Sequence, residues 1–297
     1  MTMIKSVEDY LNLLKAELAG SDAATIQDAL ADAEEHLRAA LTSIREKQPE
    51  LPEPEALTQV IEQYGSPRET ASAYTEVERR TIPQLVRENS KPGSALGRFF
   101  GVYTDARSWG ALLYMLIAFV TGVLYFTWAV TGLATSISLA LFIFGLPFAL
   151  LFFLSVRGLA LLEGRIVEAL LGVRMPRRPL FSQENLKWLD RIKELAGDKH
   201  TWFSILYMFI QFVLGTTYFV LFVTVLSFSL SFVAIPVFQE AWGQGAIMNN
   251  GIRYSFPIWS YPLLVLAGVL LWTVFMNLAR GIGQLHGRMA KSLLVTE

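Results

Sequence analysis

Residues 109–133 read WGALLYMLIAFVTGVLYFTWAVTGL, and residues 202–226 read WFSILYMFIQFVLGTTYFVLFVTVL. Thirteen of these 25 aligned positions are identical, among them Trp, Tyr and Gly as well as aliphatic residues. A second block, R-G-x-x-x-L-x-G-R-x-x-x-x-L-L, occurs at 157–171 and again at 280–294. Apolar composition alone does not produce matched tryptophans, tyrosines, glycines and arginines. The chain therefore contains an internal duplication, with offsets of 93 and then 123 residues.

Long uncharged runs predict membrane-spanning helices. No Asp, Glu, Lys or Arg occurs over the 49 residues from Ser108 to Val156, and two further uncharged runs cover 201–239 and 254–279. A spanning helix needs about 20 apolar residues and satisfies its own backbone hydrogen bonds. The first run is therefore long enough for two crossings, with a turn near 132–136. The predicted spans are 109–131, 136–156, 203–226 and 258–279.

The distribution of Lys and Arg predicts the orientation in the membrane. Basic residues gather before the first span, between the second and third spans, and after the fourth, whereas 235–257 has only Glu240 and Arg253 as charged residues. Because short loops rich in Lys and Arg stay in the cytoplasm, both termini and the middle loop are predicted to be cytoplasmic, in a multi-pass protein of the cell membrane. Both repeats then begin inside, as parallel copies related by an axis along the membrane normal.

The average composition, 53% hydrophobic with a mean hydropathy of +0.40, conceals a division of charge. Residues 1–90 carry 9 basic and 17 acidic side chains, a balance of −8, whereas residues 91–297 carry 16 and 9, a balance of +7. An acidic head argues against direct binding of nucleic acid, and a basic membrane half predicts contact with anionic lipids of the bilayer. The chain has no cysteine, which excludes disulfides and thiolate chemistry.

The first 80 residues predict a small helical domain. Helices are expected from Ser6, over 22–44, over 55–64 and from Pro67 onward, with a capping box at Ser66–Glu69 and Gly65 as the preceding C-cap. We therefore divide the chain into a cytosolic acidic helical domain (1–80), a linker (81–94) and a duplicated four-helix transmembrane domain (95–297). Within the last, repeat one covers 95–173 and repeat two covers 183–297. The predicted fold class is an all-α membrane protein.

Each repeat is expected to begin with an amphipathic segment on the membrane surface, at 95–107 and 183–196, and to end in an interfacial elbow helix formed by the R-G block. Trp109 and Trp202 mark where the first span of each repeat begins, since Trp prefers the interface. Ser227–Phe232 alternates Ser with Phe or Leu, a pattern that fits either a strand or the end of the third span.

Two segments resemble known families. The motif D-x-x-[ST]-W followed by L-Y-M, at Asp105–Met115 and at Asp198–Met208, together with the R-G blocks, is similar to a membrane sensor domain of bacteria and archaea that occurs alone or ahead of histidine kinase modules. Residues 5–80 resemble the HAAS-type helical cytosolic domain, through Tyr10–Leu18, the helix around Glu34-Glu35-His36, and Tyr64–Pro67. Proteins with such heads are often encoded beside PadR-type transcriptional regulators. The resemblance implies no assigned ligand or catalytic residue. No kinase module is expected, because the sequence stops at Glu297.

The sequence contains few residues in patterns suited to catalysis or metal binding. His36, His200 and His286 are too few and too scattered for a metal site, and no phosphate-binding loop, nucleophile elbow or zinc-protease helix occurs. No enzymatic activity, metal or cofactor is therefore expected. His200 and His286 hold the positions of Arg107 and Glu163 in the other copy, which suggests sites that tolerate any polar residue. The predicted spans contain no ionisable acidic or basic side chain, which argues against an ion-coupled transporter.

Two groups of candidate site residues remain. The external loop supplies a candidate ligand surface, made of Glu240, Trp242, Asn249, Arg253 and Tyr254. The cytoplasmic interface supplies candidates for lipid binding or coupling, namely Arg157, Arg165, Arg280, Arg288, Trp109 and Trp202. Snorkelling of the arginines and simple anchoring of the tryptophans are the alternatives for this second group. Gly122, Gly215, Gly158 and Gly281 are expected to mark close helix packing.

The favoured function is a non-catalytic integral membrane sensor that passes an external or bilayer signal to the cytosolic helical domain. A cytosolic regulator, or a second copy of the chain, would bind through residues 1–80. The alternative is a membrane subunit of a transport or envelope-stress assembly. A lipid-handling enzyme is a third hypothesis, and the sequence disfavours it because no acid–base pair is placed at the membrane.

Overall fold

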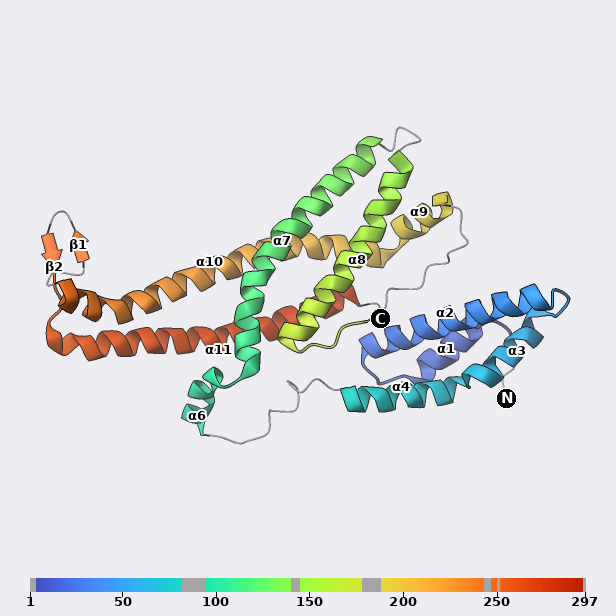
Figure 1. The fold of residues 1–297 in the computed structure, drawn as a ribbon, viewed down its shortest axis with the longest axis horizontal. Helices are drawn as coiled ribbons and strands as arrows, with labels where there is room; N and C mark the ends of the chain where they lie inside the picture. Colours follow the sequence, from blue (N-terminus) through green and yellow to red (C-terminus); the bar gives the residue numbers. More distant parts are fainter. Residues whose placement is uncertain are drawn as a thin grey trace.

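The membrane half of the protein is built from two long helical hairpins that cross each other (Figure 1). The computed structural model describes residues 4–81, 94–139, 145–177, 188–242, 247–249 and 252–295. One hairpin pairs α7 (Ala106–Leu139) with α8 (Gly145–Leu171), and the other pairs α10 (Lys199–Trp242) with α11 (Tyr261–Leu294). Within the described residues, these four helices are long and apolar enough to cross a membrane, so the chain is a multi-pass membrane protein.

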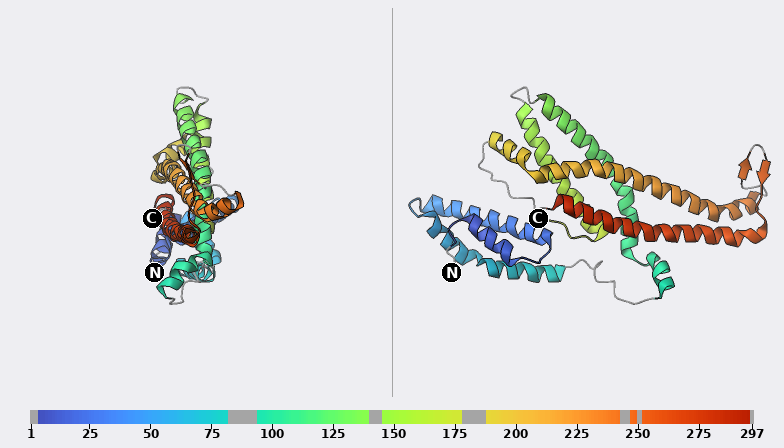
Figure 2. Two further views of the ribbon diagram at one scale, coloured as in Figure 1. Left: turned by 90° about the vertical axis from the view of Figure 1, so that its left-hand side faces the viewer. Right: turned by 180° about the vertical axis from the view of Figure 1, so that it is seen from behind.

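Short elements flank the hairpins. α6 (Ala95–Phe100) and the 3₁₀ turn η1 (Gly101–Tyr103) precede α7, and α9 (Trp188–Gly197) precedes α10. The tip of the second hairpin carries an antiparallel pair of strands, β1 (Ile247–Asn249) and β2 (Ile252–Tyr254), followed by η2 (Ile258–Ser260). The predicted all-helical class is therefore right apart from this small strand pair. From their crossing, the two hairpins diverge toward separate tips, as two further views confirm (Figure 2).

The spanning helices are longer than the sequence predicted. The turn expected near 132–136 is wrong, because α7 continues to Leu139 and Gly132 packs there against the ring of Phe152. The ends predicted at 156, 226 and 279 are also wrong, since α8, α10 and α11 run on to Leu171, Trp242 and Leu294. The R-G blocks accordingly continue their helices and form no separate elbows. The charges that seemed to end the spans, Arg157 and Arg280, form ion pairs with aspartates at the start of the opposite hairpin.

The alternation of Ser with Phe or Leu at Ser227–Phe232 lies inside α10 and is helical. Ser229 is buried there, and its hydroxyl donates a hydrogen bond of 2.7 Å to the carbonyl oxygen of Gly268 in α11. Gly268 has no room for a side chain, because a Cβ would lie 2.8 Å from the carbonyl oxygen of Ser229. The small residues thus let α10 and α11 pack closely along the second hairpin.

Residues 4–81 form a separate helical head. Its helices are α1 (Val7–Glu17), α2 (Ala23–Lys47), α3 (Glu53–Tyr64) and α4 (Pro67–Thr81), which confirms the four that were predicted. The capping box is also confirmed, since the N–H of Ser66 donates to the Glu69 carboxylate at 2.8 Å and lowers the pKa of Glu69. Fully buried Tyr10 anchors the core, and its hydroxyl donates to the carbonyl of Gly65 at 2.9 Å.

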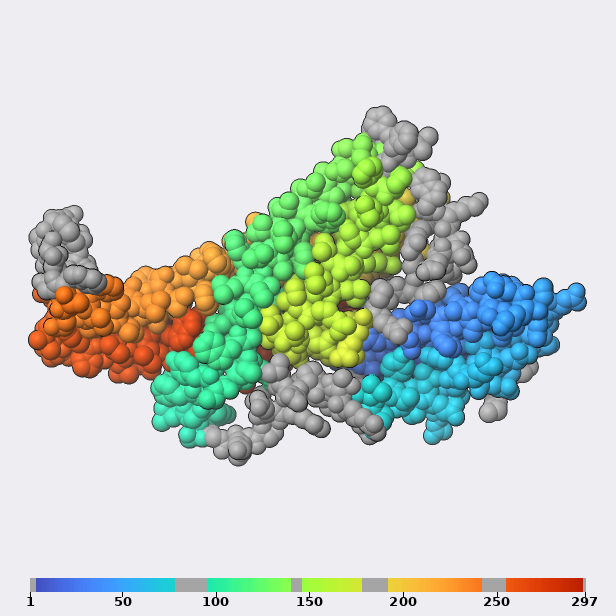
Figure 3. Space-filling model, viewed as in Figure 1, coloured from blue at the N-terminus to red at the C-terminus, as the bar shows by residue number. Residues whose placement is uncertain are grey.

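The head lies beside the ends of α8 and α11, on the side of the molecule away from the tip of the second hairpin (Figure 3). Separate apolar cores fill the head, the crossing of the hairpins and the upper part of the first hairpin. The structure therefore has one place where the two hairpins meet, and one place where the head meets both of them.

Candidate functional site

The hairpins meet where α7 crosses α10 with almost no side chains between their backbones. A Cβ on Gly122 would lie 2.7 Å from the carbonyl oxygen of Gln211, and one on Gly215 would lie closer still to the carbonyl oxygen of Ala118. The predicted close packing at Gly122 and Gly215 is confirmed. It is wrong for Gly158 and Gly281, because a Cβ at either position would meet none of the described atoms within 4 Å.

The contacts at this crossing come in matched pairs. Gly122 and Gly215 are separated by 93 residues, and so are the residues that they approach, Ala118 and Gln211. Beside them, Phe119 stacks on Phe219 and Phe126 stacks on Phe212, with ring centroids 4.5 Å apart in both pairs. These four phenylalanines also map onto each other by the offset of 93. Each contact therefore occurs twice, the second time with the two copies exchanged.

A group of buried polar side chains lies next to the crossing. The carboxylate of Glu163 (α8) accepts hydrogen bonds from Tyr114 (α7) at 2.7 Å and from Tyr207 (α10) at 3.0 Å. The Nε2 atom of His286 (α11) lies 2.6 Å from the Tyr114 hydroxyl and 3.0 Å from that of Tyr207. The amide of Gln211 donates to Glu163 at 3.2 Å. All four spanning helices therefore contribute to one hydrogen-bonded network.

Two further tyrosines close this network. Tyr125 donates to the second carboxylate oxygen of Glu163 at 3.2 Å, and the Tyr218 hydroxyl lies 3.2 Å from Nδ1 of His286. We call the whole set the polar cluster: Tyr114, Tyr125, Glu163, Tyr207, Gln211, Tyr218 and His286. Glu163 is wholly buried, and His286 is only 1% exposed.

The polar cluster corrects two expectations from the sequence. Glu163 and His286, which share one aligned position, do not stand at a site that tolerates any polar residue, since they approach each other through Tyr114. The spans also do contain ionisable side chains, because α8 and α11 continue past the predicted ends and include both residues. Burial of ionisable groups inside spanning helices is costly and is typical of functional sites.

Ion pairs connect the two hairpins where α7 and α10 begin. Arg157 of the first hairpin pairs with Asp198 at the start of the second, at 2.8 Å. Arg280 of the second hairpin pairs with Asp105 at the start of the first, at 3.2 Å. Each aspartate also caps its own helix, since Asp105 accepts from the Arg107 N–H and Asp198 from the His200 N–H. The candidate coupling residues Arg157 and Arg280 thus bind carboxylates of the opposite copy.

The environment of Asp198 favours its ionised form. Partial burial opposes ionisation, but the N–H of His200 and the guanidinium of Arg157 outweigh it and hold the pKa of Asp198 below its usual range. Because this pKa is lowered in the folded state, the stabilisation is present above the ordinary pKa of Asp and is lost as the pH falls through the folded value.

The remaining interfacial candidates divide into two kinds. Trp109 donates its indole N–H to the carbonyl of Tyr103 at 2.9 Å, and Trp202 donates to the carbonyl of Ala196 at 2.8 Å. Each bond ties a spanning helix to the short element before it. Arg165 makes a long, exposed pair with Glu168 on its own helix, and Arg288 is exposed.

The candidates at the tip of the second hairpin lie only partly within the described residues. Glu240 accepts a hydrogen bond of 3.0 Å from the Tyr261 hydroxyl, and this bond joins α10 to α11 at their tip. The side chains of Trp242, Asn249, Arg253 and Tyr254 lie outside the described residues. The backbone pairs Asn249 with Ile252 and Met248 with Arg253. The predicted ligand surface therefore stays a prediction.

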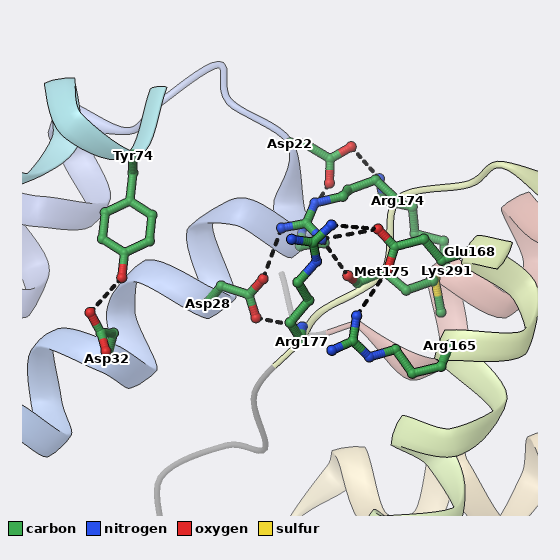
Figure 4. A network of polar contacts seen from close by, with 11 residues as sticks. Asp22, Asp28, Asp32, Tyr74, Arg165, Glu168, Arg174, Met175, Arg177 and Lys291 are labelled. Carbon is green, nitrogen blue, oxygen red and sulfur yellow. Dashed lines mark hydrogen bonds and ion pairs between the residues drawn. The ribbon is translucent and has the colours of Figure 1, made fainter. Parts of the chain in front are cut away.

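The head is attached to both hairpins by carboxylates of α2 (Figure 4). Asp28 binds Arg174 at 3.0 Å and accepts from the backbone N–H of Arg177 at 2.6 Å. Asp22, which caps α2, forms an ion pair with Lys291 near the end of α11. Arg174 is held in turn by Glu168 of α8 at 3.1 Å. One helix of the head thus binds both the segment after α8 and the end of α11.

The contribution of the Arg157–Asp198 pair can be measured by a double-mutant cycle. We expect Arg157→Ala and Asp198→Ala to show a coupling free energy of about 1–3 kcal/mol, because the pair is short and joins two hairpins. Unfolding of the purified protein in detergent measures it. The pair Arg45–Glu53 of the head, in which both side chains are exposed, is the control and should give less than about 1 kcal/mol. Equal coupling in both pairs would contradict a structural role for the cross-hairpin pair.

Sequence reasoning missed most of these functional residues. Asp22 gave only the signal of a helix start, Asp28 gave none beyond acidic composition, and Gln211 has no polar counterpart in the other copy. The polar cluster did leave a trace, since Tyr114/Tyr207 and Tyr125/Tyr218 recur at the offset of 93 inside apolar runs. A tyrosine that recurs inside predicted spans needs a buried hydrogen-bond partner. In the structure, Glu163 and His286 are such partners.

No curated protein and no solved structure matches the chain. A family model with the description "Putative sensor" matches residues 114–294. That stretch begins at Tyr114 and ends at Leu294, so it contains the entire polar cluster and the crossing of the hairpins. On this match, the chain belongs to the Putative sensor family.

Proposed function

We propose that the protein is a non-catalytic membrane sensor in which a shift between the two hairpins changes how the cytosolic head is docked. One observation carries this proposal: α2 binds Arg174, which follows α8, through Asp28, and binds Lys291 of α11 through Asp22. The two carboxylates belong to one rigid helix, whereas their partners belong to different hairpins. A relative movement of the hairpins must therefore strain or break one of the two attachments.

The scale of the movement that would suffice is small. Helices at packed interfaces shift by about 1–2 Å in many switching proteins. An ion pair between side chains weakens once its atoms separate beyond hydrogen-bonding distance. A shift of this size between α8 and α11 would favour one attachment of α2 over the other. The signal can then leave the membrane as a change in the position or exposure of the head.

The matched contacts at the crossing support two parallel copies of one two-helix unit, each preceded by an interfacial segment. The excess of Lys and Arg supports cytoplasmic termini, and the four-helix head supports a HAAS-type domain that a cytosolic regulator or a second copy of the chain would bind.

Single cysteines at Ser43, Ser182 and Asn249 test the orientation, because the chain has no native cysteine. An impermeant reagent applied to intact cells should label only Asn249→Cys, and labelling of Ser182→Cys would contradict the topology.

Lipid and ligand contacts follow from the same arrangement. Of the four candidate arginines, Arg157 and Arg280 bind carboxylates of the opposite hairpin, whereas Arg165 and Arg288 are exposed and are therefore better placed to meet anionic headgroups. The external signal, if it is a ligand, would bind the tip around Glu240, where α10 and α11 are joined. Either input acts on the spacing of the hairpins.

Spin labels can test the coupling directly. One pair, Ile137→Cys and Val237→Cys, reports the spacing of the hairpins at exposed sites on α7 and α10. A second pair, Ser43→Cys and Leu285→Cys, reports the docking of the head on α11. We expect Tyr114→Phe, which removes a hydrogen bond that links the hairpins, to change both distance distributions in lipid nanodiscs.

Tyr261→Phe is the matched control, because it removes one tyrosine hydroxyl from α11 at the far tip. It should leave the docking of the head unchanged. The proposal fails if Tyr114→Phe alters the spacing of the hairpins while the distribution between head and α11 stays as in the parent protein.

A second function, as a membrane subunit of a transport assembly, is favoured by one observation. Glu163 and His286 are ionisable and buried within spanning helices, as in many ion pathways. Proteoliposomes loaded with a pH-sensitive dye and given a membrane potential would test it. A steady proton flux that Glu163→Gln abolishes would support transport, and the absence of flux would leave the sensor.

A further inference from the structure

The charge of the polar cluster is not balanced by any ion pair. The groups that contact the carboxylate of Glu163 are the hydroxyls of Tyr114, Tyr125 and Tyr207 and the amide of Gln211. All of them are neutral donors. Among the described residues, no Lys or Arg is within ion-pair distance of Glu163. An ionised carboxylate in this position would be a buried charge without a partner, which proteins avoid.

His286 is the one group of the cluster that can carry a positive charge. It does not touch Glu163, but the hydroxyl of Tyr114 lies between them, 2.7 Å from the carboxylate oxygen and 2.6 Å from Nε2 of the ring. Both contacts have hydrogen-bond length, and each of them needs a hydrogen. Tyr114 supplies only one. The second hydrogen must come from Glu163 or from His286.

The hydrogens can be arranged in two ways around Tyr114. In the first, a protonated Glu163 donates to Tyr114, which donates to Nε2 of a neutral His286. In the second, the Nε2–H of a protonated His286 donates to Tyr114, which donates to an ionised Glu163. In both, Nδ1–H of the ring donates to Tyr218, at 3.2 Å. The two arrangements differ only by two hydrogens that move along the line Glu163–Tyr114–His286, and both are neutral overall.

We propose that Glu163, Tyr114 and His286 form a proton-binding site that holds one exchangeable proton at the crossing of the hairpins. The titratable groups that face this proton are Tyr114 and Tyr125 from α7, Glu163 from α8, Tyr207 and Tyr218 from α10, and His286 from α11. Departure of the proton leaves one negative charge buried where all four helices meet. Binding of a proton thereby favours the packed crossing, whether or not the head senses it.

Two spectroscopic measurements on the full chain in nanodiscs test the site. Nitrogen NMR with ¹⁵N-labelled histidine distinguishes neutral from protonated imidazole, and His286 is the resonance that survives in both His36→Gln and His200→Gln. Infrared spectroscopy detects a protonated carboxylic acid by its carbonyl stretch, which shifts in heavy water. Near neutral pH we expect one proton in total: a protonated His286 with no acid band, or a neutral His286 with an acid band that Glu163→Gln removes.

Glu163→Gln gives the decisive comparison, because glutamine keeps the shape and removes the charge. His286 should be neutral in this variant whichever arrangement the parent protein adopts. A neutral His286 in the unaltered chain, without any acid band that depends on Glu163, would overturn the site, and so would two bound protons. The charge state of His286 in the unaltered chain is read without any substitution at the cluster. Glu34→Gln, which removes a carboxylate that pairs with Arg38 on the same helix of the head, should leave all of these signals unchanged.

Discussion

Gly215→Ala is expected to separate the two hairpins at their crossing and to cost about 3 kcal/mol, the upper end of what overpacking a tight interior usually costs. The new methyl group would stand against the carbonyl oxygen of Ala118, and Gly122→Ala would meet the carbonyl oxygen of Gln211 at 2.7 Å. A flexible side chain can rotate away from such an intrusion. A backbone carbonyl inside a continuous helix cannot, so the whole of α7 or α10 must shift.

The R-G blocks provide matched controls for this prediction. Gly158→Ala and Gly281→Ala make the same chemical change in helices of the same hairpins, at positions where no described atom lies within 4 Å of the new Cβ. They should be neutral or stabilising by up to about 1 kcal/mol, because alanine is the better helix former. Unfolding in a detergent series and the distance between labels at Ile137→Cys and Val237→Cys measure the effect. Equal stability of Gly215→Ala and Gly158→Ala would contradict the close crossing.

Asp28→Asn is expected to release the head from the membrane half. Asp28 is buried, and its carboxylate binds the guanidinium of Arg174 and the backbone N–H of Arg177. Removing one partner of a buried ion pair costs about 3 kcal/mol, which corresponds to roughly a hundredfold change in the docking equilibrium. The labels at Ser43→Cys and Leu285→Cys should report a broad distribution in place of a single distance.

Glu34→Gln is the control for this second prediction. It removes a carboxylate from the same helix, but among the described residues Glu34 forms its ion pair with Arg38, four residues away, at 2.9 Å. It should cost a few tenths of a kcal/mol and leave the head docked. The exchange Asp28→Arg with Arg174→Asp should restore part of the docking. A head that stays in place in Asp28→Asn would show that apolar contacts, rather than Asp28, hold it.

Local patterns were sufficient to predict that the long helices of this fold exist, although not where they end. The uncharged run 108–156 predicts two spanning helices because a helix in lipid must satisfy its own backbone and exclude charge, and both rules act within one segment. The head is similar: Ser6, Asp22 and Ser66 are capping residues whose effect reaches only three residues along the chain. The family resemblance read from Asp105–Met115 and the R-G blocks is consistent with the match over 114–294.

Contacts between distant segments could not be predicted in the same way. The sequence predicts that the spans end before Arg157 and Arg280, because a charged side chain inside the membrane costs free energy unless it is solvated or paired. The partners of these arginines, Asp198 and Asp105, are far away in the sequence and cannot be recognised from it. For the same reason the sequence predicts that Glu163 lies outside the membrane. Its tyrosine partners come from helices 38 to 49 residues away, and no periodicity links such positions.

The close approach of α7 and α10 makes the crossing a fulcrum. At 1.5 Å per residue, the part of α10 before Gly215 is about 24 Å long, and the part after it is about 40 Å long. The outer arm is therefore the longer one. A displacement of about 5 Å at the β1–β2 tip would move the inner end by about 3 Å, in proportion to the arms. The inner end lies beside Asp198 and the end of α11, where a movement of that size exceeds the tolerance of a hydrogen bond. In the proposed mechanism, the longer outer arm would act as a lever that converts a larger movement of the β1–β2 tip into a smaller movement at the start of α10.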